Sequence, residues 1–369
     1  MNTFLSGTAL LAMTTVLLAA DAAPEVRDLA PTLGTLAAKH KLPGVVGAIV
    51  QGDQVVALGS AGIRKFGEPE PFNDTDIIHL GSDTKAMTAI LVGQLIDKKQ
   101  LAFDTTMQEI FPKLAKKMNA PMAKVAVRQL LDHTAGLPHD LDWRALDTMR
   151  RSLPAQRRVA VEKALADPPA TPVGSFSYSN VGYVVLGAIV EAKSGKSWEA
   201  VIKRDIFRPL GMTSAGFGPP GTLGKVDQPW GHTLDRGKIT PTQIDNAAVL
   251  GPAGTVHCSM ADWCKFIAET LRGAQGHPRL VTPATFKELI TPRPNQDYAG
   301  GWIVTQRPWA GGSVLTHAGS NTTWFCNVWI APQRDFAVLI ATNYGSDPVA
   351  QAVDEGIGEL IKLHSSANR

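Results

Sequence analysis

The chain has 369 residues, including 36 lysines and arginines and 33 aspartates and glutamates, which gives a formal net charge of +3. This near balance excludes a polybasic nucleic-acid-binding protein and an acidic tail protein, so no nucleic-acid partner is expected. Hydrophobic residues make up 44% of the chain, enough for a large core, and the length suits one large domain or two closely packed ones of roughly 100–200 residues each. The three cysteines allow at most one disulfide and lack zinc-ligand spacing, so we expect buried free thiols and no metal.

The N-terminal residues have the features of an export signal. An uncharged apolar run from Phe4 to Ala20 is followed by Ala20-Asp21-Ala22, which fits the small-x-small pattern of a signal-peptidase site. We therefore expect residues 1–22 to be a signal peptide and the mature chain to be periplasmic or secreted. The alternative is membrane association through an uncleaved N-terminus, because about 17 apolar residues lie at the short end of what spans a bilayer.

Hydrophobic periodicity and turn residues predict the elements that follow. In chain order they are a helix over 26–40, strands over 45–50 and 55–63, a helix from Ser82 to Lys98 with one buried face, helices over 159–166, 181–193 and 198–207, strands over 300–305, 313–316, 324–330 and 336–342, and a closing helix over 349–363.

Strands at both ends with helices between them predict an α+β fold, in which one antiparallel sheet is flanked by helices and faces an all-α lobe. We assign residues 23–369 to this domain, with the α/β part at about 23–100 and 250–369 and the helical lobe at about 101–249. A ligand cleft is expected between the sheet and the lobe.

The first motif with chemical meaning is Ser82-Asp83-Thr84-Lys85, at the start of the predicted helix. The i, i+3 spacing brings the Lys85 amine over the Ser82 hydroxyl, and a serine needs such a base within reach to act as a nucleophile. The structural alternative is an N-cap serine followed by a solvated lysine.

The second motif is Tyr178-Ser179-Asn180, directly before the helix at 181–193. A phenol whose pKa is lowered by a nearby lysine can take a proton from serine and pass it to a leaving group. The Asn180 amide offers a donor and an acceptor to a substrate amide. Alone, this triplet also fits a helix cap with a packed tyrosine.

The third motif is His317-Ala318-Gly319-Ser320, at the end of a late strand. Gly319 lets a substrate approach the strand edge closely, and the backbone N–H of Ser320 can join that of Ser82 as an oxyanion hole. A lone His-x-Gly is weak support for either role.

In this order and at these separations, the three motifs resemble the β-lactamase-related serine hydrolases: class C β-lactamases, low-molecular-mass penicillin-binding DD-peptidases, D-aminopeptidases and the esterases derived from them. The resemblance covers roughly residues 28–345. Further stretches share it: residues 130–137 (LLDHTAGL), 176–186 (FSYSNVGYVVL), 206–212 (IFRPLGM) and 251–254 (GPAG) before 259–262 (SMAD).

The resemblance implies a mixed sheet with helices, an all-α lobe and an acyl-serine mechanism without cofactor or metal. It makes Ser82 the nucleophile, Lys85 its activator and Tyr178 the general base that later protonates the leaving group; whether Lys85 or Tyr178 takes the first proton stays open.

The resemblance also implies binding roles for the remaining motif residues. Asn180 is expected to hold the acyl side chain, and His317 to polarise Tyr178 or to meet a substrate carboxylate. The backbone N–H groups of Ser82 and Ser320 are expected to form the oxyanion hole, with Gly319 leaving room beside them.

The third motif departs from the Lys-Thr-Gly of true class C β-lactamases. A lysine keeps its charge at neutral pH, whereas a histidine can be neutral there, which weakens binding of a substrate carboxylate. His317 therefore argues against efficient β-lactam hydrolysis. Nearby, we interpret His133 as structural, and His139, Asp140 and Trp143 as either lining the substrate entrance or, more simply, a surface loop.

The sequence thus predicts an exported serine hydrolase that cleaves an ester or amide through an acyl-Ser82 intermediate. Its partner is a small-molecule ester or amide, or a peptidoglycan-like peptide. Two alternatives stay open: a penicillin-binding DD-carboxypeptidase or weak β-lactamase, and a non-catalytic protein that binds a cell-wall peptide or β-lactam.

Overall fold

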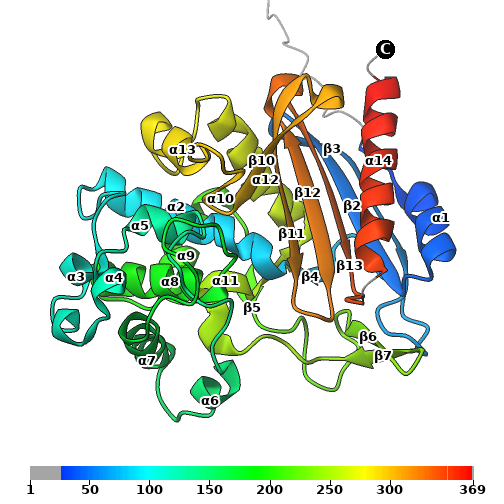
Figure 1. The fold of residues 1–369 in the computed structure, drawn as a ribbon. Coiled ribbons are helices and arrows are strands. Elements are labelled where there is room, and N and C mark those ends of the chain that lie inside the picture. The colour runs from blue at the N-terminus through cyan, green and yellow to red at the C-terminus, as the bar shows by residue number, and fades with distance from the viewer. Residues whose placement is uncertain (1–25, 347, 368–369) are drawn as a thin grey trace, which may run out of the picture.

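The structure, a computed structural model, describes residues 26–346 and 348–367, so the signal peptide predicted at 1–22 lies outside it. Its centre is an eight-stranded sheet built from both ends of the sequence (Figure 1). In spatial order the strands are β1 (Arg27–Asp28), β3 (Gln54–Gly62), β2 (Gly44–Gln51), β13 (Phe336–Thr342), β12 (Phe325–Ala331), β11 (Gly312–Ser320), β10 (Trp302–Arg307) and β9 (Tyr298–Ala299). β1 runs parallel to β3 and the other pairs are antiparallel, so the sheet is mixed.

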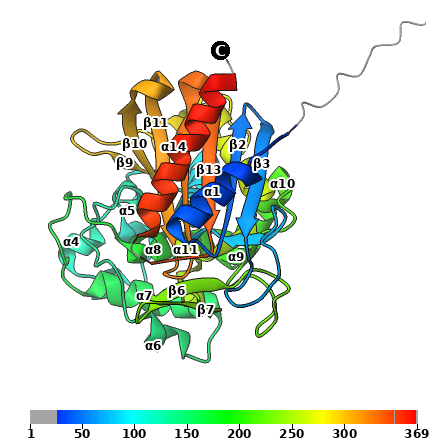
Figure 2. The same ribbon diagram turned by 90° about the vertical axis from the view of Figure 1, so that its right-hand side faces the viewer.

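Helices cover both faces of this sheet. α1 (Ala30–His40) and α14 (Val349–Ala367) lie side by side on the outer face (Figure 2), while α12 (Met260–Ala274) packs on the inner face against β2 and β13. All seven residues of β13 are buried, as expected for a strand covered on both sides. The predicted α+β fold and its late strands are thus confirmed, with boundaries that shift by a few residues.

A lobe of short and medium helices faces the inner side of the sheet (Figure 1). Its helices are α3 (Met107–Ile110), α4 (Ala120–Ala123), α5 (Val127–Leu131), α6 (Trp143–Asp147), α7 (Leu153–Ala166), α8 (Asn180–Ser194), α9 (Trp198–Ile202), α10 (Arg208–Leu210) and α11 (Gly251–Gly254). α8 is its central helix: the Ser179 hydroxyl caps its N-terminus by accepting a bond from the Gly182 N–H, and Gly195 ends it in the left-handed conformation.

The helix predicted from Ser82 is buried on more than one face. Gly81–Asp83 form a 3-10 turn, and α2 (Thr84–Asp97) follows with every residue from Thr84 to Gly93 buried. α8, α11 and α13 (Pro283–Leu289) surround it. The sequence underestimated this burial because Lys85, Thr84 and Thr88 break the apolar pattern, although all three are buried.

Two further elements differ from the prediction. A hairpin of β6 (Gly231–Asp235) and β7 (Lys238–Thr242) falls within the residues assigned to the helical lobe, and its turn at Arg236 and Gly237 has positive φ at both positions, as a tight hairpin requires. The helix predicted over 198–207 is α9 followed by a π turn (Lys203–Phe207).

A small separate sheet is formed by three further strands, β4 (Ile77–His79), β5 (Gly216–Phe217) and β8 (Val256–Ser259). Among the described residues, no helix is both long and apolar enough to cross a membrane.

A fully buried arginine ties the lobe together. Arg157 of α7 forms ion pairs with Glu191 of α8 and Glu199 of α9, and its Nε donates to the Val249 carbonyl at 3.1 Å. Burial raises the pKa of Glu191, while Arg157 acts in the opposite direction. The carboxylates therefore depend on this guanidinium for compensation.

We expect Arg157→Met to lower the free energy of unfolding by about 3 kcal/mol, because it leaves Glu191 and Glu199 without their partner in a buried site. The measurement is urea unfolding followed by circular dichroism. Lys362→Met, which breaks an exposed pair with Glu359, serves as the matched control and should change stability by less than about 1 kcal/mol. Equal shifts in the two variants would contradict this account of the lobe.

Candidate active site

Ser82 lies where the tight turn before α2 meets the end of β11. The turn carries Gly81 at a φ of +49°, and a Cβ at this position would overlap the backbone of Ser320. A Cβ at Gly319 would likewise overlap the Leu80 carbonyl. The two glycines therefore allow the strand and the turn to touch, which brings Ser82 and Ser320 together as the sequence predicted.

Lys85 is fully buried one helical turn below Ser82. Its Nζ donates to Ser82 Oγ at 2.9 Å, to Asn180 Oδ1 at 2.8 Å and to the Ala253 carbonyl at 2.8 Å. Burial lowers the pKa of Lys85 from 10.5 to about 7, although the negative charges of Asp140 and Asp83 act in the opposite direction. A lysine with this pKa exists partly as the neutral amine near pH 7 and can accept a proton.

Tyr178 and Asn180 approach from the lobe, at the N-terminal end of α8. The Tyr178 ring centroid lies 4.8 Å from Lys85 Nζ. Burial raises the pKa of Tyr178 above its usual value, and a hydrogen bond with Ser82 opposes this only in part. The lowered pKa expected from the sequence is therefore corrected: the phenol keeps its proton at neutral pH, because loss of solvent outweighs the hydrogen bond with Ser82.

His317 is buried in β11 and is held by two partners. Its Nδ1 lies 3.1 Å from Asp83 Oδ1 and its Nε2 lies 3.2 Å from the Tyr298 hydroxyl. The His317 ring is stacked on the Tyr178 ring with the centroids 6.4 Å apart, while its two ring nitrogens lie against Asp83 and Tyr298. At 5% exposure it presents little surface to a substrate carboxylate.

Asp83 and Tyr298 are therefore two members of this site that the sequence analysis did not single out. Cys326 donates its thiol to Asp83 Oδ2 at 3.0 Å, so both carboxylate oxygens are bonded. Burial raises the pKa of Asp83, and the bond to His317 acts in the opposite direction. Adjacency to Ser82 was the one signal for Asp83, whereas Tyr298 reaches the site through sheet pairing alone. Cys326 and the other two cysteines are buried free thiols, as predicted.

His133 is structural, as interpreted from the sequence. Its Nδ1 accepts a bond from the Ser179 N–H at 3.1 Å, and its ring lies 4.3 Å from the Tyr178 ring. Burial lowers its pKa well below the usual value, so the ring stays neutral and positions the Tyr178 loop.

The loop with His139, Asp140 and Trp143 is exposed, as expected of a surface loop, and it also lies beside Asn180, in line with the alternative of a substrate entrance. Asn180 Nδ2 donates to Asp140 Oδ1 at 2.9 Å, and Trp143 Nε1 donates to the same oxygen at 2.7 Å. His139 Nδ1 lies 2.5 Å from Asp140 Oδ2. Residue type alone could not separate this loop from any other polar loop.

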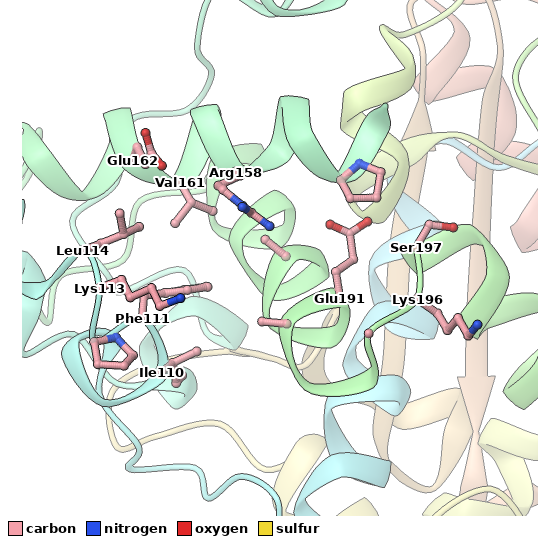
Figure 3. A pocket seen from close by; sticks show the side chains of 15 residues that line it. Ile110, Phe111, Lys113, Leu114, Arg158, Val161, Glu162, Glu191, Lys196 and Ser197 are labelled. Carbon is pink, nitrogen blue, oxygen red and sulfur yellow. The ribbon is translucent and has the colours of Figure 1, made fainter. Parts of the chain in front are cut away.

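A cavity of about 670 Å³ lies elsewhere in the lobe, between α7, α8 and the loop at 110–114 (Figure 3). Its lining includes Phe111, Arg158 and Glu191, and it contains none of the predicted site residues. The Glu191 carboxylate in this lining is paired with Arg157.

The family model described as Beta-lactamase matches residues 29–360 of the chain. Penicillin-binding protein 4 of Amycolatopsis lactamdurans is 32% identical over 182 residues, covering 48% of this chain and 45% of that protein. A penicillin-binding protein of Bacillus subtilis strain 168 is 26% identical over 310 residues, covering 77% of this chain and 64% of that protein. The chain thus spans about half to two thirds of these relatives.

A solved structure agrees on the fold. The penicillin-binding protein from Bacillus halodurans superposes with a TM-score of 0.72 at 23% identity, covering 89% of this chain and 98% of that one. With the family model matched over most of its length, the chain belongs to the β-lactamase family of serine hydrolases and penicillin-binding proteins.

Proposed function

We propose that this protein hydrolyses an ester or amide through an acyl-Ser82 intermediate. The observation that carries the proposal is the contact of 2.9 Å between Lys85 Nζ and Ser82 Oγ, with a lysine pKa of about 7. A buried amine with this pKa is an available base, and a serine hydroxyl needs one to attack a carbonyl.

The proposed reaction consists of acylation of Ser82 followed by hydrolysis of the acyl-serine. Neutral Lys85 takes the proton from Ser82 while Oγ bonds to the carbonyl carbon, and the oxyanion is stabilised by the backbone N–H groups of Ser82 and Ser320. The carbonyl–leaving-group bond breaks as Tyr178 Oη gives its proton to the leaving group, and the Lys85 ammonium restores that proton. Water then hydrolyses the acyl-serine by the reverse sequence. The assignment of Lys85 as first base follows from the two opposite pKa shifts.

Asn180, His317 and Gly319 have supporting roles in this proposal. Asn180 bonds to Lys85 and presents its amide to the acyl group. His317 is braced by Asp83 and holds Tyr298 against the Tyr178 loop. The substrate is a small-molecule ester or amide or a peptidoglycan-like peptide, met in the periplasm or outside the cell after removal of residues 1–22.

A second candidate is a penicillin-binding DD-carboxypeptidase, since two relatives are named as penicillin-binding proteins. It uses the same acyl-Ser82 chemistry and differs in how long the acyl group stays on the enzyme. A time course of protein and drug masses after mixing with a penicillin separates the candidates. A lasting adduct marks a penicillin-binding peptidase, and rapid drug hydrolysis marks a β-lactamase.

The proposal is tested by intact-protein mass spectrometry after reaction with a fluorophosphonate and, separately, with p-nitrophenyl butyrate. We expect one fluorophosphonate adduct and Ser82-dependent ester turnover in the wild type, and neither in Ser82→Ala. Ester hydrolysis that survives in Ser82→Ala would overturn the mechanism. A wild type that neither reacts nor turns over, yet binds a penicillin reversibly, would indicate the non-catalytic binding protein.

The pH dependence of kcat/KM should follow Lys85. Its pKa of about 7 means that the amine is protonated and unable to accept the serine proton at lower pH, so kcat/KM should fall about tenfold per pH unit below 7 and level off above about pH 8. The pKa of Tyr178 is raised above its usual value by burial, so this phenol adds no alkaline limb below pH 10. A profile with an acidic limb below pH 5 would contradict Lys85 as the base.

A further inference from the structure

An exposed carboxylate lies beside the substrate-facing amide of this site. Asp140 is bonded to Asn180, whose other amide atom bonds to Lys85, so two hydrogen bonds link Asp140 to the proposed base. About 40% of its side chain is exposed. Bonds from Asn180, Trp143 and His139 lower its pKa despite partial burial, so it carries a negative charge at neutral pH.

The two basic side chains of the site are already hydrogen-bonded within it. Lys85 is completely buried with three acceptors, and His317 is buried against Asp83. Among the described residues hydrogen-bonded to Lys85 or Asn180, the charged side chain open to solvent is that of Asp140. An approaching substrate therefore meets a negative charge that repels carboxylates and attracts cations.

Aromatic side chains lie next to this carboxylate. Trp143 donates its indole N–H to Asp140, and the Tyr178 ring lies 5.7 Å from the ring of His139, which is itself hydrogen-bonded to Asp140. A carboxylate next to aromatic rings is a favourable environment for an ammonium group, because the group is attracted by the opposite charge and by the faces of the rings.

We propose that Asp140 selects substrates whose acyl group carries an ammonium group over neutral or carboxylate-bearing ones. This rests on the proposed function and names its substrate class. Because Asn180 is where the acyl side chain is expected, the ammonium group would lie against Asp140 while the carbonyl lies at Ser82. The same charge disfavours substrates whose acyl group bears a carboxylate.

The test compares three p-nitrophenyl esters of similar shape. The cationic one carries a 4-(trimethylammonio)butanoyl group, the neutral one its isostere 5,5-dimethylhexanoyl, and the anionic one a glutaryl group. Rates are measured at about pH 8.5, where Lys85 is neutral with or without Asp140 and imidazoles are ordinarily uncharged. Spontaneous hydrolysis is removed by subtracting the rate with Ser82→Ala.

We expect the wild type to show a cationic-to-neutral kcat/KM ratio of about five to ten, and Asp140→Asn to bring it close to one, the scale of a partly exposed ion pair. The ratio of the glutaryl ester to the neutral ester should rise in Asp140→Asn. Asp147→Asn removes an exposed carboxylate from the neighbouring α6 and should leave the ratio unchanged.

The outcomes separate the two proposals. If no ester shows Ser82-dependent turnover, the proposed function fails and this inference with it. If the neutral ester is turned over but the wild-type ratio is near one, or if Asp140→Asn keeps the ratio, only the selection by Asp140 is overturned.

Discussion

Replacing Lys85 with methionine should lower kcat/KM for the neutral ester by about 10³–10⁴, the loss typical of removing a nucleophile's base. Methionine fills similar buried space but accepts no proton, so Ser82 keeps its place and loses its activator. Steady-state rates corrected with Ser82→Ala give the measurement. The acidic limb near pH 7 should disappear along with most of the activity, because the group that titrates there is gone.

Lys98→Met is the matched control for this variant. Lys98 lies exposed at the C-terminal end of the same helix, so its loss should leave kcat/KM within about twofold. Circular dichroism and the urea midpoint show whether Lys85→Met stays folded. A folded Lys85→Met variant that keeps a tenth or more of the activity would assign the first proton transfer to another group.

The motifs could be predicted because each couples residues through local geometry. Ser82 and Lys85 share one helical turn, and Tyr178 and Asn180 flank a capping serine, so the backbone fixes their relative positions. The contact between the Ser82 motif and the Tyr178 motif, which are nearly a hundred residues apart, was expected only from the resemblance to the family. The structure shows it directly in the bond from Lys85 to Asn180.

What the sequence analysis missed depends on packing between distant segments. Asp83 faces His317 across 234 positions, and Asp140 reaches Asn180 from a loop without periodicity. The direction of the Tyr178 pKa shift was predicted wrongly for a related reason. The motifs indicate that a lysine lies near the phenol, whereas the burial of the phenol depends on the rings that pack around it in the folded chain. Long-range burial and side-chain partners are properties of the fold, which pattern and propensity constrain weakly.

At Gly319, strand β11 lies close to the Leu80 carbonyl, so that a larger residue at this position should impair catalysis. Gly319→Ala should lower kcat by about 10²–10³, the loss typical of a displaced oxyanion-hole donor. The new Cβ would overlap the Leu80 carbonyl oxygen and lie 3.0 Å from Cys326 Sγ. Leu80 directly precedes the turn that carries Ser82, and Gly319 is held in β11 by its pairing with Cys326 of β12. To relieve this overlap, the turn and the strand must move apart. This movement increases the distance between the backbone N–H groups of Ser82 and Ser320.

The measurement is kcat and KM on the neutral ester, with Gly358→Ala as the matched glycine control. A Cβ at Gly358 in α14 meets nothing within 4 Å, so that variant should keep full activity and gain slightly in stability. In Gly319→Ala we expect kcat to fall more than KM changes, because the donors act on the charge that develops during attack rather than on the bound substrate. A kcat within about threefold of wild type would show that Ser82 and Ser320 do not need this close contact, and the oxyanion would have to be stabilised elsewhere in the cleft.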